Sequence, residues 1–142
     1  MIDVRAATWA DDQALIAAVR RTVFIDEQRV PEALEWDGLD DDARHWLARA
    51  GERAVGTARL LPGGQIGRMA VLAPWRRRGV GSALLHAALG AARAAGLGAV
   101  FLHAQVHALA FYARHGFVVE GPVFDDAGIP HRAMRLAFKQ SA

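Results

Sequence analysis

The sequence predicts one α+β domain, residues 1–142, in which helices flank a mixed, mostly antiparallel sheet. Its length is enough for one domain with its own core. Three short strand-like runs follow one another with three-residue connections, which is typical of antiparallel hairpins. Two later segments have helical periodicity and each ends at a glycine. This order of elements favours helices packed on a sheet.

The first elements are a strand over 2–7 and a helix after it. Thr8 and Asp11 have the spacing of a helix-capping pair. Apolar residues four positions apart continue the pattern to about Phe24 and give the helix one apolar face: Leu15, Val19 and Val23. The segment 35–42 holds five carboxylates around a glycine and is expected to be an exposed loop, which could attract a cationic amine.

The remaining elements follow in a regular order. Strands are expected over 45–50, 54–61, 65–72, 99–104 and 131–138, and helices from Gly79 to Gly96 and over 107–116. A strand, a helix and a second strand form a crossover, so the strands at 65–72 and 99–104 should be parallel neighbours.

Composition excludes several classes of protein. The chain contains no cysteine, which excludes disulfides and cysteine nucleophiles and fits a reducing compartment. The formal net charge is only +2, which gives little support to nucleic-acid binding. No stretch reaches the ~18 apolar residues of a membrane span. We therefore expect a cytoplasmic protein with no nucleic-acid or membrane partner.

The stretch PWRRRGVG, residues 74–81, suits an anion. Its two glycines lie between a strand and the first turn of a helix, where unpaired N–H groups and the helix dipole favour a phosphate. The sequence lacks the Gly-Lys-Ser/Thr of a nucleotide P-loop and the third glycine of a dinucleotide fingerprint. Two alternatives are a surface loop with solvated arginines and a nucleic-acid contact.

Two motifs together resemble the GNAT superfamily of N-acetyltransferases. Arg76-Arg77-Arg78-Gly79-Val80-Gly81 matches the family's Arg/Gln-x-x-Gly-x-Gly/Ala signature, and residues 108–117 match its Ala-x-x-Phe-Tyr-x-x-x-Gly-Phe pattern. The stretches RRTVFIDEQRVPEALEWDGLDDDARHWLA and GIPHRAMRL are similar to the ElaA-like branch. The resemblance covers nearly the whole chain and implies the GNAT, or acyl-CoA N-acyltransferase, fold.

The resemblance also implies a binding site for acetyl-CoA. Backbone N–H groups from Arg77 to Ser82 would hold the pyrophosphate, and the Arg76 and Arg77 side chains could reach the phosphates. The edge of the fourth strand would pair with the pantetheine amides, and a backbone N–H of Ala70 or Val71 would polarise the thioester carbonyl. The complete expected cofactor-binding set is Met69, Ala70, Val71, Arg76, Arg77, Arg78, Gly79, Val80, Gly81 and Ser82.

Tyr112 is the expected general acid. It is the only tyrosine, and it occupies the tyrosine position of the second motif. A tyrosine with a pKa near ~10 is protonated at neutral pH and can donate to a departing thiolate, whose thiol has a pKa near ~8.5. The alternative is that its ring serves only in packing.

No single base stands out in the sequence. Many family members carry a glutamate on the fourth strand, where this chain has Arg68. His103, Glu27 and His131 are candidates, each with a purely structural alternative, and Gln105 and His131 are expected to contact the substrate. No zinc-binding histidine pattern occurs, so no metal is expected.

The expected function is acetyl-CoA-dependent N-acetylation of a primary amine on a small molecule or peptide. The alternative is a non-catalytic acyl-CoA-binding sensor module, which the missing glutamate would suit. The family resemblance also implies a possible homodimer.

Overall fold

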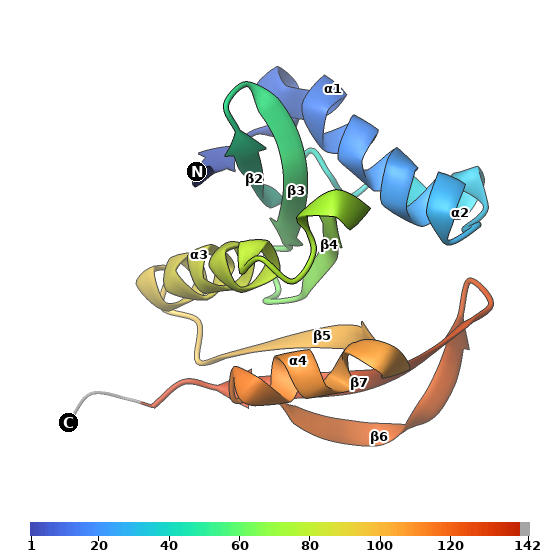
Figure 1. Cartoon of the computed structure of the whole chain (residues 1–142). Coiled ribbons are helices and arrows are strands. Elements are labelled where there is room, and N and C mark those ends of the chain that lie inside the picture. Colours follow the sequence, from blue (N-terminus) through green and yellow to red (C-terminus); the bar gives the residue numbers. More distant parts are fainter. Residues whose placement is uncertain (140–142) are drawn as a thin grey trace.

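The computed structural model describes residues 1–139, and the last three residues of the expected domain lie outside that part. Two antiparallel sheets form its framework (Figure 1). One has the strand order β1-β2-β3-β4 and the other β5-β7-β6. Their bounds are β1 Ile2–Ala7, β2 Arg44–Ala50, β3 Arg53–Leu60, β4 Ile66–Val71, β5 Ala99–Gln105, β6 Val118–Asp126 and β7 Ile129–Ala137.

Within residues 1–139, four α-helices and three short helical segments connect the strands. The α-helices are α1 Trp9–Arg20, α2 Glu32–Glu35, α3 Val80–Ala94 and α4 Leu109–Arg114. A π-helical segment, η1 Arg21–Glu27, continues α1, and the 3-10 segments η2 Ala73–Trp75 and η3 Val106–Ala108 precede α3 and α4. The α+β prediction is therefore confirmed.

The two sheets meet where β4 begins. An isolated parallel bridge joins Gln65 to Phe101, and the Phe101 N–H donates to the Gly64 carbonyl at 3.1 Å. The expected parallel pairing of β4 and β5 is thus limited to this point. Farther along β4, a β-bulge opposite Ala58 places Arg68 at a φ of 47°. Bulges bend and twist a strand, which lets β4 diverge from β5 towards their carboxyl ends.

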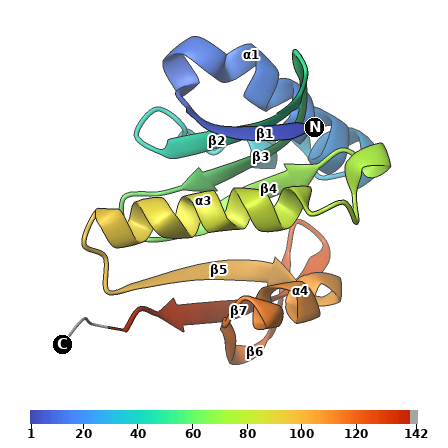
Figure 2. The ribbon, with the colours of Figure 1, turned by 60° about the vertical axis from the view of Figure 1, so that its left-hand side comes forward.

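Helix α3 covers the junction between the two sheets, as two views of the ribbon show (Figures 1 and 2). A Cβ at Gly56 on β3 would lie 3.0 Å from Leu84 Cδ1 and 3.2 Å from Val80 Cγ1. The missing side chain therefore lets the helix approach the strand closely. The apolar face of α3 is buried in the core, as its period predicts: Val80, Leu84, Leu85, Ala88, Leu89 and Ala92.

The predicted cap of the first helix is present. The Asp11 N–H donates to Thr8 Oγ1 at 3.1 Å, and the Thr8 N–H donates to the Asp12 carboxylate at 3.0 Å. The reciprocal acid is therefore Asp12, one residue later than the expected pair. The α-helix ends at Arg20, and the helical path continues through η1 to Glu27, beyond the expected end.

The expectation of an exposed acidic loop at 35–42 is wrong for two of its carboxylates. Glu35 and Asp40 are buried because Arg20, itself 0% exposed, donates from Nε to Glu35 at 2.8 Å and from Nη1 to Asp40 at 2.6 Å. Arg59 donates to Asp37 and Asp40 at 2.9–3.1 Å. Buried carboxylates require such partners, so these residues form an internal ion-pair network.

Strand β6 was not assigned bounds from the sequence. Its centre contains Gly121 and Pro122, which interrupt the alternating pattern of a strand. The register with β7 shifts between Glu120 and Phe124, around these residues. Proline is tolerated there because β6 is at the edge of its sheet.

Candidate active site

A cavity of about 770 Å³ opens where β4 and β5 diverge. Segments from both halves of the fold line it: η1, β4, β5, α4 and the β6–β7 connection. It brings together nine of the residues predicted for the site: Glu27, Met69, Ala70, Val71, Arg76, His103, Gln105, Tyr112 and His131. The other six, 77–82, lie in the loop before α3 and in its first turn.

The outer edge of β4 presents Val71 to the cavity. The Leu72 N–H donates to the Val55 carbonyl on β3 at 2.9 Å, whereas the Val71 carbonyl accepts from Arg76 Nε at 2.9 Å. The N–H and C=O of one residue in an antiparallel strand point to the same side. The Val71 N–H therefore lies on the edge of β4 away from β3. It is better placed than the Ala70 N–H to donate a hydrogen bond to the thioester carbonyl.

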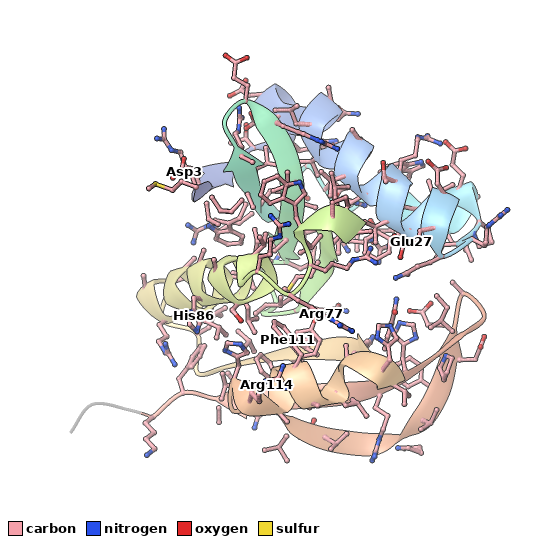
Figure 3. All side chains as sticks on the ribbon, in the orientation of Figure 1. Asp3, Glu27, Arg77, His86, Phe111 and Arg114 are labelled. Atoms are coloured by element: carbon pink, nitrogen blue, oxygen red, sulfur yellow. The ribbon has the colours of Figure 1, made fainter. Side chains whose placement is uncertain are left out.

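The loop before α3 has the geometry of an anion site. Gly79, the N-cap of this 15-residue helix, has a φ of 81°, and Arg77 has a φ of 62°. The first N–H groups of a helix have no partner within it, and the helix dipole adds partial positive charge there. Figure 3 shows Arg77 and Phe111 on facing elements, this loop and α4. Ser82 Oγ lies 3.2 Å from His115 Nε2, which joins α3 to the end of α4.

Arg76 is engaged with Glu27 rather than extended towards the α3 loop. Its Nη1 and Nη2 atoms each donate to one Glu27 carboxylate oxygen at 2.7 Å. The hydrogen bond from Arg76 lowers the pKa of Glu27, more strongly than partial burial raises it. Glu27 is therefore a weaker proton acceptor than a free glutamate while this pair persists.

Tyr112 extends from α4 into the core and reaches the cavity. Burial raises the pKa of its hydroxyl to about 12, so it remains protonated throughout the neutral range. The hydroxyl lies 3.8 Å from Met69 Sδ on β4, a weak hydrogen bond. The rings of Phe111 and Phe117 pack edge-on to it with centroids at 5.0 and 6.0 Å. Tyr112 therefore places a proton donor in the cavity beside the Met69 side chain of β4.

Gln105 and two histidines lie on the C-terminal sheet. Gln105 Nε2 donates to Gln28 Oε1 at 2.9 Å, which connects β5 to the end of η1 across the cavity. His103 is exposed and packs edge-on to Phe124 at 5.2 Å. His131 is 8% exposed, and its Nδ1 lies 2.7 Å from the Ile129 carbonyl oxygen. Both imidazoles line the cavity.

Sequence reasoning missed the environment of Arg68 and the role of Gln28. Arg68 Nη2 donates to the Glu35 carbonyl and to Asp37 Oδ2, both at 3.2 Å, so the residue that replaces the family glutamate belongs to the ion-pair network. Burial lowers the pKa of Arg68 and raises that of Glu35. Gln28 follows the π-helical segment η1, and no sequence pattern predicts a π-helix there. The family pattern marks position 68 as a site position, but it gives no signal for Gln28.

Neither a metal-binding cluster nor a membrane-spanning helix occurs within residues 1–139. In this part of the chain, no three histidine or carboxylate side chains are placed to hold a metal ion. The helices there are too short or too polar to cross a membrane.

Comparison with known proteins shows the family of the chain. A family model described as the acetyltransferase (GNAT) domain matches residues 6–138. The chain is 39% identical over 120 residues to YjcF of Bacillus subtilis, described as an uncharacterized N-acetyltransferase, with 82% of this chain and 86% of YjcF covered.

Solved structures give the same result. An acyl-CoA N-acyltransferase from Pseudomonas aeruginosa is 34% identical with a TM-score of 0.85, covering 96% of this chain and all of that one. ElaA of Escherichia coli is 28% identical with a TM-score of 0.85, covering 95% and 99%. The fold and cavity thus define an acyltransferase of α+β architecture. The chain belongs to the GNAT family of acetyltransferases and is ElaA-like.

Proposed function

We propose that this protein transfers an acetyl group from acetyl-CoA to a primary amine of a small molecule or peptide, by direct attack of the amine on the thioester. The observation that carries the proposal is the cavity between β4 and β5. It is bordered by the outer edge of β4, where the Val71 N–H points away from β3, and by a protonated hydroxyl at Tyr112. Acetyl transfer needs a carbonyl polariser and a proton donor for the thiolate.

The first part of the proposal concerns acetyl-CoA. The N–H groups of residues 77–82 bind the pyrophosphate, and the Arg76, Arg77 and Arg78 side chains supply positive charge. The backbone of Met69–Val71 pairs with the pantetheine amides. The positive φ of Gly79 and the free start of a long helix support this assignment. For Arg76 to contact a phosphate it must leave Glu27.

The second part concerns the chemistry and the setting. Tyr112 protonates the departing sulfur, and Gln105 orients the acceptor. Glu27, His103 and His131 remain the groups available to accept a proton from the amine. A cytoplasmic location and a possible homodimer belong to the same proposal.

Calorimetry tests the binding step directly. Acetyl-CoA, CoA and NAD would be titrated into the wild-type protein and into Gly81→Asp, which places a carboxylate in the first turn of α3. We expect both CoA species to bind the wild-type protein, NAD not to bind, and Gly81→Asp to lose CoA binding. Equal CoA affinity in the variant would overturn the loop assignment.

Thiol release tests the reaction. Acetyl-CoA would be incubated with free amino acids, spermidine, tyramine and a lysine-containing peptide. We expect at least one amine to raise thiol release well above hydrolysis and to appear as its N-acetyl product. Tight acetyl-CoA binding without transfer to any amine would instead support the non-catalytic sensor.

A further inference from the structure

The two faces of the β5-β7-β6 sheet present different groups to the cavity. Side chains alternate along β5, so Leu102 and Ala104 enter the core, whereas His103 and Gln105 lie on the other face. His131 on β7 is in register with Gln105 and shares its face. Tyr112 packs against the core on the opposite side, where α4 covers the sheet (Figure 1). Tyr112 and His131 therefore reach one cavity from opposite faces.

The hydrogen bond to Ile129 determines which nitrogen of His131 carries the proton. A carbonyl oxygen can only accept, so the Nδ1 atom at 2.7 Å donates to it. In the neutral ring Nε2 then has a free lone pair. The ring also stacks on Phe124, with centroids 5.9 Å apart and planes inclined by 25°. A base held by a third group in this way is typical of catalytic histidines.

The other two candidates lack this arrangement. Both Glu27 oxygens accept from Arg76 at 2.7 Å, and this lowers the pKa of the carboxyl. His103 is exposed, and its contacts are aromatic, with Phe101 at 6.1 Å and Phe124 at 5.2 Å. Neither contact selects a tautomer. Of the three groups, His131 alone combines burial, a fixed tautomer and a place in the cavity wall.

We propose that His131 accepts the proton of the acceptor amine through Nε2, an inference that rests on the proposed acetyl transfer. The ammonium group gives one proton to Nε2, and the neutral nitrogen attacks the thioester carbon. The C–N bond forms and the C–S bond breaks, while Tyr112 protonates the sulfur. The second nitrogen proton restores the Tyr112 hydroxyl, and His131 releases its proton to water.

Other ionisable groups line the same cavity as His131. Those on the N-terminal half are Glu27, Glu35, Arg68 and Arg76, and those on the C-terminal half are His103, His107, Tyr112 and Asp126. Glu27 is paired with Arg76. Glu35 is paired with the buried Arg20 and with Arg68, whose Nε lies 3.2 Å from Glu35 Oε2. Asp126 is exposed at the end of β6.

The test is the pH dependence of kcat/KM for the best amine of the panel. We expect His131→Gln to lower kcat/KM at neutral pH by on the order of 10²–10⁴-fold. The deficit should shrink towards pH ~10, where an alkylamine loses its own proton. The matched variant His103→Gln should keep the pH at which the wild-type kcat/KM profile bends, even if its kcat/KM is lower. Unchanged turnover in His131→Gln, or loss of the inflection in His103→Gln instead, would overturn the proposal.

Two controls keep the result interpretable. Acetyl-CoA affinity and the thermal midpoint of His131→Gln should stay close to wild type, because the residue lies on the face opposite α3 and α4. Nitrogen-15 NMR of histidine-labelled protein at pH 8 should show His131 protonated at Nδ1 and bare at Nε2, and the reverse tautomer would contradict the assignment. Wild-type protein that transfers acetyl to no amine would overturn the proposed function as well, whereas an active wild type with an equally active variant overturns His131 alone.

Discussion

Arg76 and Glu27 form a bidentate ion pair in the wall of the cavity, with both donor–acceptor distances at 2.7 Å. The same guanidinium donates from Nε to the Val71 carbonyl at 2.9 Å. Arg76 thus occupies a backbone acceptor that the pantetheine arm is proposed to use. In the structure, the first residue of the arginine motif holds the β4 edge and η1 together.

Glu27→Gln should tighten acetyl-CoA binding, because phosphate and Glu27 compete for Arg76. Exposed ion pairs contribute about 0.2–1 kcal/mol, so the expected gain is roughly 1.4- to five-fold in Kd. Asp26→Asn removes the same charge from the neighbouring exposed residue without breaking the pair, and it controls for general repulsion of a polyanion. Calorimetry would measure all three proteins. An equal gain in acetyl-CoA affinity in both variants, or no gain in either, would show that Arg76 does not exchange Glu27 for a phosphate of the cofactor.

Alanine should destabilise the protein at Gly79 but not at Gly81. Gly79 has a φ of 81°, and alanine in that left-handed conformation costs about 1–2 kcal/mol. Gly81 lies inside α3, and a Cβ there would meet Phe111 at an ordinary 3.5 Å, so alanine should be neutral or stabilise by up to about 1 kcal/mol. Urea unfolding of the two variants measures the free energies. A stable Gly79→Ala would contradict the conformational argument.

Tyr112→Phe should reduce turnover by at least tenfold, and acetyl-CoA affinity should change little. The hydroxyl's only hydrogen bond among the described residues is the weak one to Met69 at 3.8 Å, so its loss removes a proton donor and little binding energy. Steady-state thiol release and calorimetry separate the two effects. Full turnover in the variant would remove Tyr112 from the mechanism.

The same tyrosine should make stability fall at high pH. Its folded pKa of about 12 exceeds the unfolded value near ~10, so the stabilisation is complete below pH ~10 and is lost as the pH rises through ~12. At pH 11 the wild-type protein should have lost about 1 kcal/mol from this group alone. Urea unfolding at pH 8 and pH 11 would compare it with Tyr112→Phe, which lacks the loss. An equal pH dependence of the two proteins would show that the hydroxyl titrates normally.

Local patterns predicted the elements that form the site. Short turns indicated the hairpins, the 3.6-residue period indicated α3, and Thr8 indicated the start of α1. The family resemblance supplied the proposed cofactor loop and the proposed role of Tyr112. Each of these signals lies within a few neighbouring residues, which is why a single sequence could carry it.

Long-range pairings could not be predicted in this way. Arg76 and Glu27 are 49 positions apart, and Arg20 and Glu35 are 15 apart. Which charges meet depends on how the sheets and helices are packed, and no local pattern encodes that. The local pattern of carboxylates at 35–42 therefore predicts an exposed loop, although Glu35 and Asp40 are buried.

Two adjacent arginines give a direct test of that buried network. Arg20 and Arg21 both form ion pairs, but the Arg20 side chain is 0% exposed and that of Arg21 is 45% exposed. Arg20→Ala leaves Glu35 and Asp40 buried without their main partner, and breaking a buried pair on one side costs about 3–5 kcal/mol. Arg21→Ala frees only the exposed Glu32 carboxylate, which water can solvate, so stability should barely change. Urea unfolding of both variants at pH 7 measures the contrast, and similar losses would show that burial does not set the strength of these pairs.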